Sequence, residues 1–221
     1  LINNAISSKD QIHISTVNNE ILLESRINFE FRTVLKKSFC IADSTGVVWA
    51  VRKLYKRRID RIPGADLFYD ICREAEKNGW SIFLLGGDRG IAHIAKSKLE
   101  DEFPKLKIVG TIDGVKINPT EGNLLHNTKI KNSGANIVMV ALGAPKQELW
   151  IAHNMKRTKS NVFIGIGGTL DFVSGNIKRA PLYMRRAGLE WLYRLMVEPM
   201  RIKRIWNALI VFPIIVMFRR N

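Results

Sequence analysis

Cysteine is nearly absent from this chain of 221 residues, which contains only Cys40 and Cys72. A small fold held together by disulfides is therefore excluded, and because both cysteines lie among apolar neighbours we expect two buried thiols, as in a reducing compartment. Metal ligands are also sparse, since the four histidines have no ligand spacing and no Asp-x-Asp pair occurs. The sequence thus predicts no zinc, Mg²⁺ or Mn²⁺ site and no other cofactor.

Long apolar runs are missing as well. The longest covers residues 205–218 and is interrupted by Asn207 and Pro213, whereas a helix needs about 20 apolar residues to span a bilayer. A run of this length can still lie along a membrane surface. No charged-then-apolar signal peptide opens the chain, and because it begins with Leu1 we expect its N-terminus to be truncated.

Acidic residues are few: 20 Asp and Glu stand against 35 Lys and Arg, which gives a net charge of +15. Such an excess requires an anionic partner outside the fold, either nucleic acid, anionic lipid or a phosphorylated substrate. Residues 176–221 hold ten of these cations and two acids, a net +8, together with Trp191, Tyr193 and Trp206. We therefore divide the chain into a body, residues 1–175, and a basic, aromatic, helical C-terminal appendage.

The body alternates short apolar runs with helical stretches. This order predicts an α/β fold, a Rossmann-like parallel sheet flanked by helices, because parallel strands buried on both faces are continuously apolar. The expected strands are residues 12–16, 38–42, 81–85, 107–111, 136–142 and 161–166. The expected helices are residues 65–78, 91–102, 122–132 and 146–156, with another that begins near Val47.

In an open parallel sheet, ligands bind beyond the carboxyl ends of the strands. Two predicted strands end in Gly86-Gly87 and Gly167-Gly168, which bring bare backbone to that edge. A third is followed by Gly143-Ala144-Pro145-Lys146-Gln147, which places a lysine and an amide in the first turn of a helix. Backbone N–H groups at such ends bind phosphate, so the three loops together predict a nucleotide or sugar-phosphate cleft. Each loop taken alone is also explained as a tight turn or a helix start.

One carboxylate, Asp43, directly follows a predicted strand and precedes a helix. It is either a general base at the cleft or the N-cap of that helix, and the sequence does not separate the two. Thr16 and Asn18, near the end of the first strand, are candidates to line the same cleft, or ordinary turn residues. Arg61, in a Pro-Gly turn, could bind a diphosphate or be solvated.

Several strings of the sequence carry a resemblance to a known family. They are Thr16-Val17-Asn18, Ala42-Asp43-Ser44-Thr45-Gly46, Arg61-Ile62-Pro63-Gly64-Ala65-Asp66, Gly143-Ala144-Pro145-Lys146-Gln147-Glu148, Gly165-Ile166-Gly167-Gly168-Thr169 and Gly188-Leu189-Glu190-Trp191-Leu192-Tyr193-Arg194. Their order over nearly the whole chain resembles the WecG/TagA/CpsF glycosyltransferases, glycosyltransferase family 26. The chain departs from the family at Val17, at Ser44 and at residues 112–115, and the last change bears on the choice of donor sugar.

The resemblance implies an inverting, metal-independent transfer of a sugar from a UDP-sugar to a polyprenyl-diphosphate-linked N-acetylhexosamine, in the synthesis of a bacterial cell-surface polysaccharide. A ManNAc or ManNAc-uronate-like group is the expected sugar. By position Asp43 matches the family's general base, and Thr16 matches a residue at the reaction centre. The expected substrate-binding residues are Asn18, Arg61, Gly86, Gly87, Lys146, Gln147, Gly167, Gly168, Arg194, Arg201 and Arg204.

The resemblance also implies membrane contact through the appendage, and so a cytoplasmic enzyme on the inner face of the bacterial plasma membrane. The alternatives for this segment are a helix pair that covers the sheet edge and an interface between identical chains. The charge leaves a basic nucleic-acid-binding α/β protein as the alternative function, although the sequence has no helix-turn-helix or zinc pattern and no aromatic and basic sheet surface. A dehydrogenase is excluded, because Gly-x-Gly-x-x-Gly with its downstream acid is missing.

Overall fold

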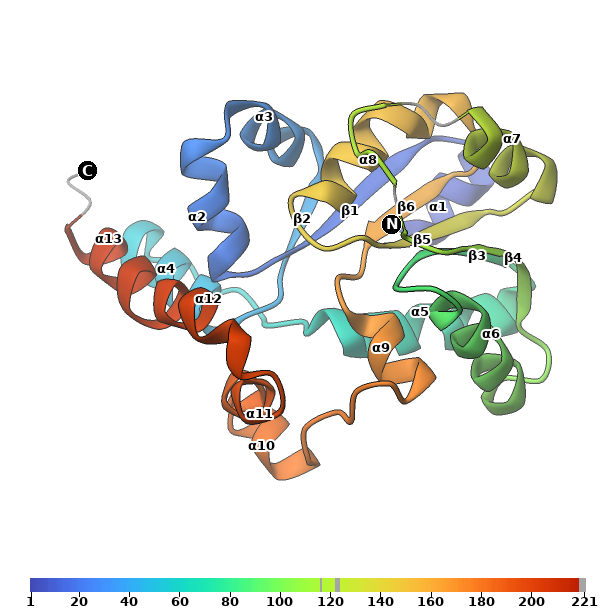
Figure 1. The fold of residues 1–221 in the computed structure, drawn as a ribbon. Helices are drawn as coiled ribbons and strands as arrows, with labels where there is room; N and C mark the ends of the chain where they lie inside the picture. Colours follow the sequence, from blue (N-terminus) through green and yellow to red (C-terminus); the bar gives the residue numbers. More distant parts are fainter. Residues whose placement is uncertain (116, 122–123, 219–221) are drawn as a thin grey trace.

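The computed structural model describes residues 1–115, 117–121 and 124–218, apart from the side chains of Arg186 and Arg201. Within these residues the chain forms a six-stranded parallel sheet in the order β2-β1-β6-β5-β3-β4 (Figure 1). The strands are β1 (Ile12–Val17), β2 (Phe39–Ala42), β3 (Ser81–Gly86), β4 (Lys107–Ile112), β5 (Ile137–Ala141) and β6 (Val162–Gly165). All six predicted strands are present, each end within one residue of its prediction.

Helices cover both faces of the sheet. One face carries α1 (Ile2–Ser8), α5 (Gly64–Asn78), α6 (Ile91–Glu102) and α9 (Thr169–Ser174). The other carries α2 (Asn19–Ile27), α3 (Phe29–Lys37), α7 (Leu124–Ser133) and α8 (Lys146–Asn154), and a short 3-10 turn, Met155–Arg157, follows α8. The predicted helices over residues 65–78, 91–102 and 146–156 are confirmed, and residues 122–123, where the fourth was expected to begin, lie outside the described residues.

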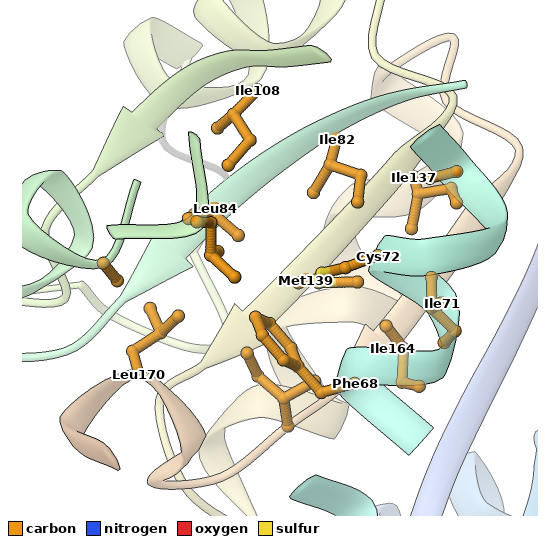
Figure 2. Close-up of a cluster of buried hydrophobic side chains, with 14 of the residues drawn as sticks. Phe68, Ile71, Cys72, Ile82, Leu84, Ile108, Ile137, Met139, Ile164 and Leu170 are labelled. Carbon is orange, nitrogen blue, oxygen red and sulfur yellow. The ribbon is translucent and has the colours of Figure 1, made fainter. Parts of the chain in front are cut away.

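Alternate residues of the central strands face opposite helix layers. Ile82 and Leu84 of β3 join the cluster under α5 and α6, where Cys72 is buried as predicted (Figure 2). Phe83 and Leu85 join the cluster under α7 and α8. All four β3 side chains are fully buried. Because both faces are covered, the strand is continuously apolar in sequence and its two-residue period does not appear as a change in polarity.

Two features of the β2 side of the sheet differ from the sequence predictions. The prediction that both cysteines are buried is wrong for Cys40, which is exposed because β2 is an edge strand whose amino end is open to solvent. Helices α2 and α3 were not among those predicted. Their signals are Asn18 and Asn28, whose side chains accept hydrogen bonds from the N–H groups of Ile21 (3.1 Å) and Phe31 (3.0 Å) and cap the two helices.

The C-terminal segment, residues 176–218, folds back beside α2 and α4 (Thr45–Tyr55) (Figure 1). It contains α10 (Leu182–Arg186), α11 (Glu190–Val197), the 3-10 turn η2 (Pro199–Arg201), α12 (Ile202–Trp206), the π-helical turn η3 (Asn207–Val211) and α13 (Phe212–Phe218). The last three follow one another without a break. Pro213 is the second residue of α13, just after the π turn; the wider π turn accommodates a proline, which lacks a backbone N–H and whose ring crowds the preceding turn.

Apolar packing, a hydrogen bond and an ion pair are among the contacts that hold this segment to the body. Phe212 and Val216 of α13 are buried against Ala50 of α4. The Asn19 side chain donates a hydrogen bond of 2.8 Å to the carbonyl oxygen of Ala208. Arg179, just before α10, is paired with Asp66 of α5 at 2.7 Å. These contacts place the segment over the carboxyl edge of the sheet.

Candidate active site

A cleft of about 1160 Å³ opens at the carboxyl ends of β1, β2, β5 and β6. Its walls include α2 and the C-terminal segment, so that residues far apart in the sequence meet there. The predicted site residues that line it are Thr16, Asn18, Asp43, Arg61, Gly87, Lys146, Gln147, Gly167, Gly168, Arg194 and Arg204. Gly86 does not line the cleft, and the side chain of Arg201 lies outside the described residues. The topology thus brings most of the predicted residues to one place.

Asp43 is positioned by two elements. Its backbone N–H donates to the carbonyl oxygen of Val17 (2.9 Å), which continues the pairing of β2 with β1. Its carboxylate Oδ1 accepts a hydrogen bond of 2.6 Å from the backbone N–H of Gly64, the first residue of α5. The interpretation of Asp43 as the N-cap of the following helix is wrong, because Ser44 caps α4 by accepting from the N–H of Val47.

The electrostatic surroundings of Asp43 combine opposing effects. Burial is the largest and raises the pKa of this carboxyl above its ordinary value, and the nearby Glu190 carboxylate raises it further. The Gly64 N–H, the Arg61 guanidinium and the Asn18 side chain favour the charged form and lower the pKa. Arg61 is held in place because its Nε donates to the Asp43 carbonyl oxygen at 3.0 Å. The result is a carboxylate of increased basicity with a fixed cation beside it.

Thr16 lies at the same end of the cleft. It is the penultimate residue of β1 and is buried, and its hydroxyl donates to the carbonyl oxygen of Gly165 at the end of β6 (2.9 Å). A side chain at Gly64 would lie 3.4 Å from the Thr16 hydroxyl, methyl and Cβ atoms, which is an ordinary van der Waals distance. The start of α5 therefore packs on Thr16, and the hydrogen bond from the Gly64 N–H brings the Asp43 carboxylate near it.

Gln147 and Glu148 form a buried, hydrogen-bonded pair behind the loop that follows β6. Gln147 Oε1 accepts a hydrogen bond of 3.0 Å from the Gly167 N–H, and its Nε2 donates to Glu148 Oε1 at 2.8 Å. Glu148 is fully buried, and burial raises its pKa to about 7. Glu148 was not among the predicted site residues, although it belongs to the Gly143–Glu148 string. The pair fixes the turn that presents Gly167 and Gly168 to the cleft.

The Gly86-Gly87 turn is shaped by packing. A side chain at Gly86, whose φ is 122°, would come within 2.3 Å of the Ala141 carbonyl oxygen on the adjacent strand. The Gly87 N–H donates to that same oxygen at 3.0 Å, and the Gly87 carbonyl accepts from Gly114 at 2.8 Å. This close approach of two strands explains Gly86. Gly87 is explained by its φ of 73° and by Ile91, which a side chain there would meet at 2.7 Å; of the two glycines, Gly87 alone reaches the wall of the cleft.

Two arginines of the C-terminal segment reach the cleft. The Arg194 guanidinium lies over the Phe172 ring, 4.6 Å from its centroid, and is paired with Glu198 at 2.9 Å. Arg204 Nε donates to Glu20 on α2 at 2.8 Å. Both arginines are therefore oriented by protein groups and can still meet an anionic ligand on the cleft side.

Part of the cleft lining is apolar. It comprises Leu23 and Ile27 of α2 and Ile205, Leu209 and Ile215 of the C-terminal segment, in which η3 and α13 pack against α2. This apolar lining could not be predicted from the sequence, because it depends on α2 and on the way the chain folds back. The cleft thus combines the polar groups around Asp43 with apolar side chains suited to hydrocarbon.

Two further properties of the described residues bear on the site. Within residues 1–115, 117–121 and 124–218, no three His, Cys, Asp or Glu side chains gather closely enough to hold a metal ion. In that same part of the chain, every helix is too short or too polar to cross a bilayer.

A family model described as "Glycosyl transferase WecG/TagA/CpsF family" matches residues 1–221, the whole chain.

Proposed function

The chain belongs to the WecG/TagA/CpsF family of glycosyltransferases, which act in cell-surface polysaccharide synthesis, and we propose that it transfers a sugar with inversion at the anomeric carbon. The donor is UDP linked to ManNAc or to a ManNAc-uronate-like sugar. The acceptor is a polyprenyl-diphosphate-linked N-acetylhexosamine. The observation that carries the proposal is the position of Asp43. Asp43 lines the cleft, the Gly64 N–H donates to its carboxylate, and the Arg61 side chain donates to its backbone carbonyl oxygen.

Asp43 acts as the general base in this proposal. A hydroxyl oxygen of the acceptor sugar attacks the anomeric carbon while Asp43 takes the hydroxyl proton. The bond from the anomeric carbon to UDP breaks on the opposite face, and UDP leaves with the bonding electrons. A raised pKa makes Asp43 a stronger base than an ordinary aspartate, and the fixed Arg61 cation helps to keep it ionised.

Positive groups along the cleft stabilise the leaving group. Charge develops on the β-phosphate as UDP departs, and cations and helix N-termini stabilise such charge. Lys146 lies in the first turn of α8, whose N-terminus opens on the cleft, and Arg194 of the C-terminal segment lines the same cleft. We propose that these groups, with Arg61, neutralise the diphosphate without a metal ion.

In this proposal the lipid-linked acceptor enters along the apolar lining of the cleft. The first isoprene units fit the wall formed by Leu23, Ile27 and Leu209, and the remaining lipid stays in the bilayer. Exposed apolar side chains of the C-terminal segment, among them Met200, Trp206 and Phe218, would contact that bilayer, with the cations of the segment at the headgroups. The enzyme is then peripheral on the inner face of the bacterial plasma membrane.

A donor screen tests the proposal. UDP-ManNAc, the UDP-ManNAc-uronate and UDP-GlcNAc are each offered with a polyprenyl-diphosphate-GlcNAc analogue, and the product is identified by mass and by the configuration of its new linkage. We expect one of the first two donors to give a product of inverted configuration in the presence of a chelator. A retained configuration, or UDP release that requires added metal, would contradict the mechanism.

A further inference from the structure

A basic stripe lies on the solvent side of α4, outside the cleft. It consists of Trp49, Arg52 and Lys53 of the helix, of Lys56, the left-handed C-cap residue that follows it, and of Arg58. The three helical positions have the spacing i, i+3 and i+4, which places them on one face. All five side chains are exposed and surround one shallow hollow of about 470 Å³. We call these five residues the α4 stripe.

The fold and the cleft do not explain the α4 stripe. None of its cations is paired with a carboxylate in the described part of the chain, and residues 44–59 contain no acidic residue. Uncompensated like charges on one helix face repel each other, and Trp49 keeps 38% of its surface exposed. A tryptophan among lysines and arginines is the composition found where a protein meets a bilayer interface.

The neighbour of α4 favours a lipid partner over nucleic acid. Ala50 and Leu54, on the inner side of α4, pack against Phe212 and Val216 of α13, so the two helices lie side by side (Figure 1). The other residues of α13 include Ile214, Met217 and Phe218, which are 50% to 78% exposed. The helix that carries the stripe therefore lies beside a helix with exposed apolar side chains, which a bilayer can cover and a phosphodiester backbone cannot.

We propose that the α4 stripe is a second contact with an anionic bilayer, in addition to the C-terminal segment. Helix α4 begins at Thr45, two residues after Asp43, and at 1.5 Å per residue its eleven residues span about 16 Å. A bilayer bound at the far end of α4 would hold the cleft at a fixed, short distance from lipid headgroups. This orienting role depends on the proposed function, whereas the lipid contact itself does not.

Vesicle binding of the full chain tests the contact. The triple variant Arg52→Gln, Lys53→Gln, Lys56→Gln is compared with the matched triple Lys77→Gln, Lys131→Gln, Lys159→Gln, which removes the same charge from exposed positions at the ends of α5, α7 and the loop before β6. These control positions lie at the amino edge of the sheet, opposite the cleft. Binding is measured by sedimentation with phosphatidylcholine vesicles that contain or lack phosphatidylglycerol.

We expect the stripe triple to bind phosphatidylglycerol vesicles about 10- to 100-fold more weakly than wild type, and the control triple to bind less than fivefold more weakly. Quenching of tryptophan fluorescence by brominated acyl chains should also decrease in Trp49→Phe and not in Trp80→Phe. Equal losses in the two triples would overturn the proposal, because they would reflect net charge alone.

Other outcomes separate this inference from its alternatives. The stripe triple could keep wild-type vesicle binding and instead lose affinity for duplex DNA at matched salt, or change its own association state. The stripe would then bind nucleic acid or a second copy of the chain, and the proposal would fail.

Transfer to a short, water-soluble acceptor should be unchanged in the stripe triple. If wild type transfers no sugar and yet binds vesicles through the stripe, the proposed function fails and the lipid contact stands.

Discussion

The carboxylate of Asp43 caps a helix that begins in a different loop, through the 2.6 Å hydrogen bond from the Gly64 backbone N–H. Pro63 at the N-cap of α5 offers no side-chain cap of its own. Asp43 supplies the missing acceptor, and the positive end of this fifteen-residue helix favours its charged form. A carboxylate has further lone pairs, so the same group can hold the helix end and still take a proton.

Asp43→Asn should lower the rate of sugar transfer about 10²- to 10⁴-fold, the usual contribution of a general base. The asparagine oxygen can still accept from the Gly64 N–H, so the melting temperature and the affinity for UDP should remain close to wild type. Steady-state kinetics, calorimetric UDP titration and thermal unfolding measure the three quantities. A variant that keeps near-normal kcat would show that another group takes the proton.

The charges beside Asp43 should move the acidic limb of the pH profile in opposite directions. Arg61→Gln removes a cation that lowers the pKa of Asp43, so the limb should shift to higher pH and activity should recover as the solution is made more alkaline. Glu190→Gln removes an anion that raises this pKa, so its limb should shift to lower pH. The measurement is kcat/KM against pH. Shifts of the same sign in both variants would disagree with this account of the carboxylate.

Two buried groups, His13 and Glu148, make stability depend on pH in opposite senses. Burial lowers the pKa of His13 from 6.5 to about 4, so the folded state binds fewer protons there than the unfolded chain, and stability rises with pH across that window. Burial raises the pKa of Glu148 from 4.5 to about 7, so the folded state binds more protons, and stability falls as pH rises from 4.5 to about 7. The two dependences largely offset each other.

Single variants should separate the contributions of His13 and Glu148 to the pH dependence of stability. Relative to wild type, the free energy of unfolding of Glu148→Gln should increase by about 3 kcal/mol between pH 4.5 and 7, because a neutral side chain has no charge to desolvate. That of His13→Asn should decrease by a similar amount between about pH 4 and 6.5. Urea unfolding at several pH values measures both, with the exposed His93→Asn as control. Differences from wild type that do not vary with pH would refute the assignment.

Asn19 should decide how firmly the C-terminal segment is docked. Asn19→Ala removes the hydrogen bond to the Ala208 carbonyl and the 2.8 Å bond from the Ser44 hydroxyl. A loss of about 1 to 2 kcal/mol in docking should speed tryptic cleavage at the exposed Lys203 about 5- to 30-fold, since local opening limits such cleavage. Limited proteolysis with mass spectrometry measures the rate, with the exposed Asn132→Ala as control. Equal cleavage rates would show that other contacts hold the segment.

The strand pattern and most of the candidate site could be predicted from sequence because their signals are local. A buried parallel strand must be apolar along its length. Gly167 follows such a strand and Lys146 opens the helix after another, so parallel topology gathers them at one edge. Helices α2 and α3 give a weaker signal, since only their asparagine caps mark them. The position of Cys40 could not be predicted, because the order of the strands, and not the residues around the thiol, makes β2 an edge.

The sequence by itself determined the α/β class, the basic C-terminal segment that carries +8 of the net charge of +15, and most of the residues that meet at the cleft. Only the tertiary structure decided what these residues touch: Asp43 the end of α5, Gln147 the Gly167 N–H and Asn19 the Ala208 carbonyl. Each of these bonds joins segments that lie far apart along the chain. Hydrophobic periodicity and glycine placement are properties of neighbouring residues, whereas such pairings arise only when the sheet has set the distance between its loops.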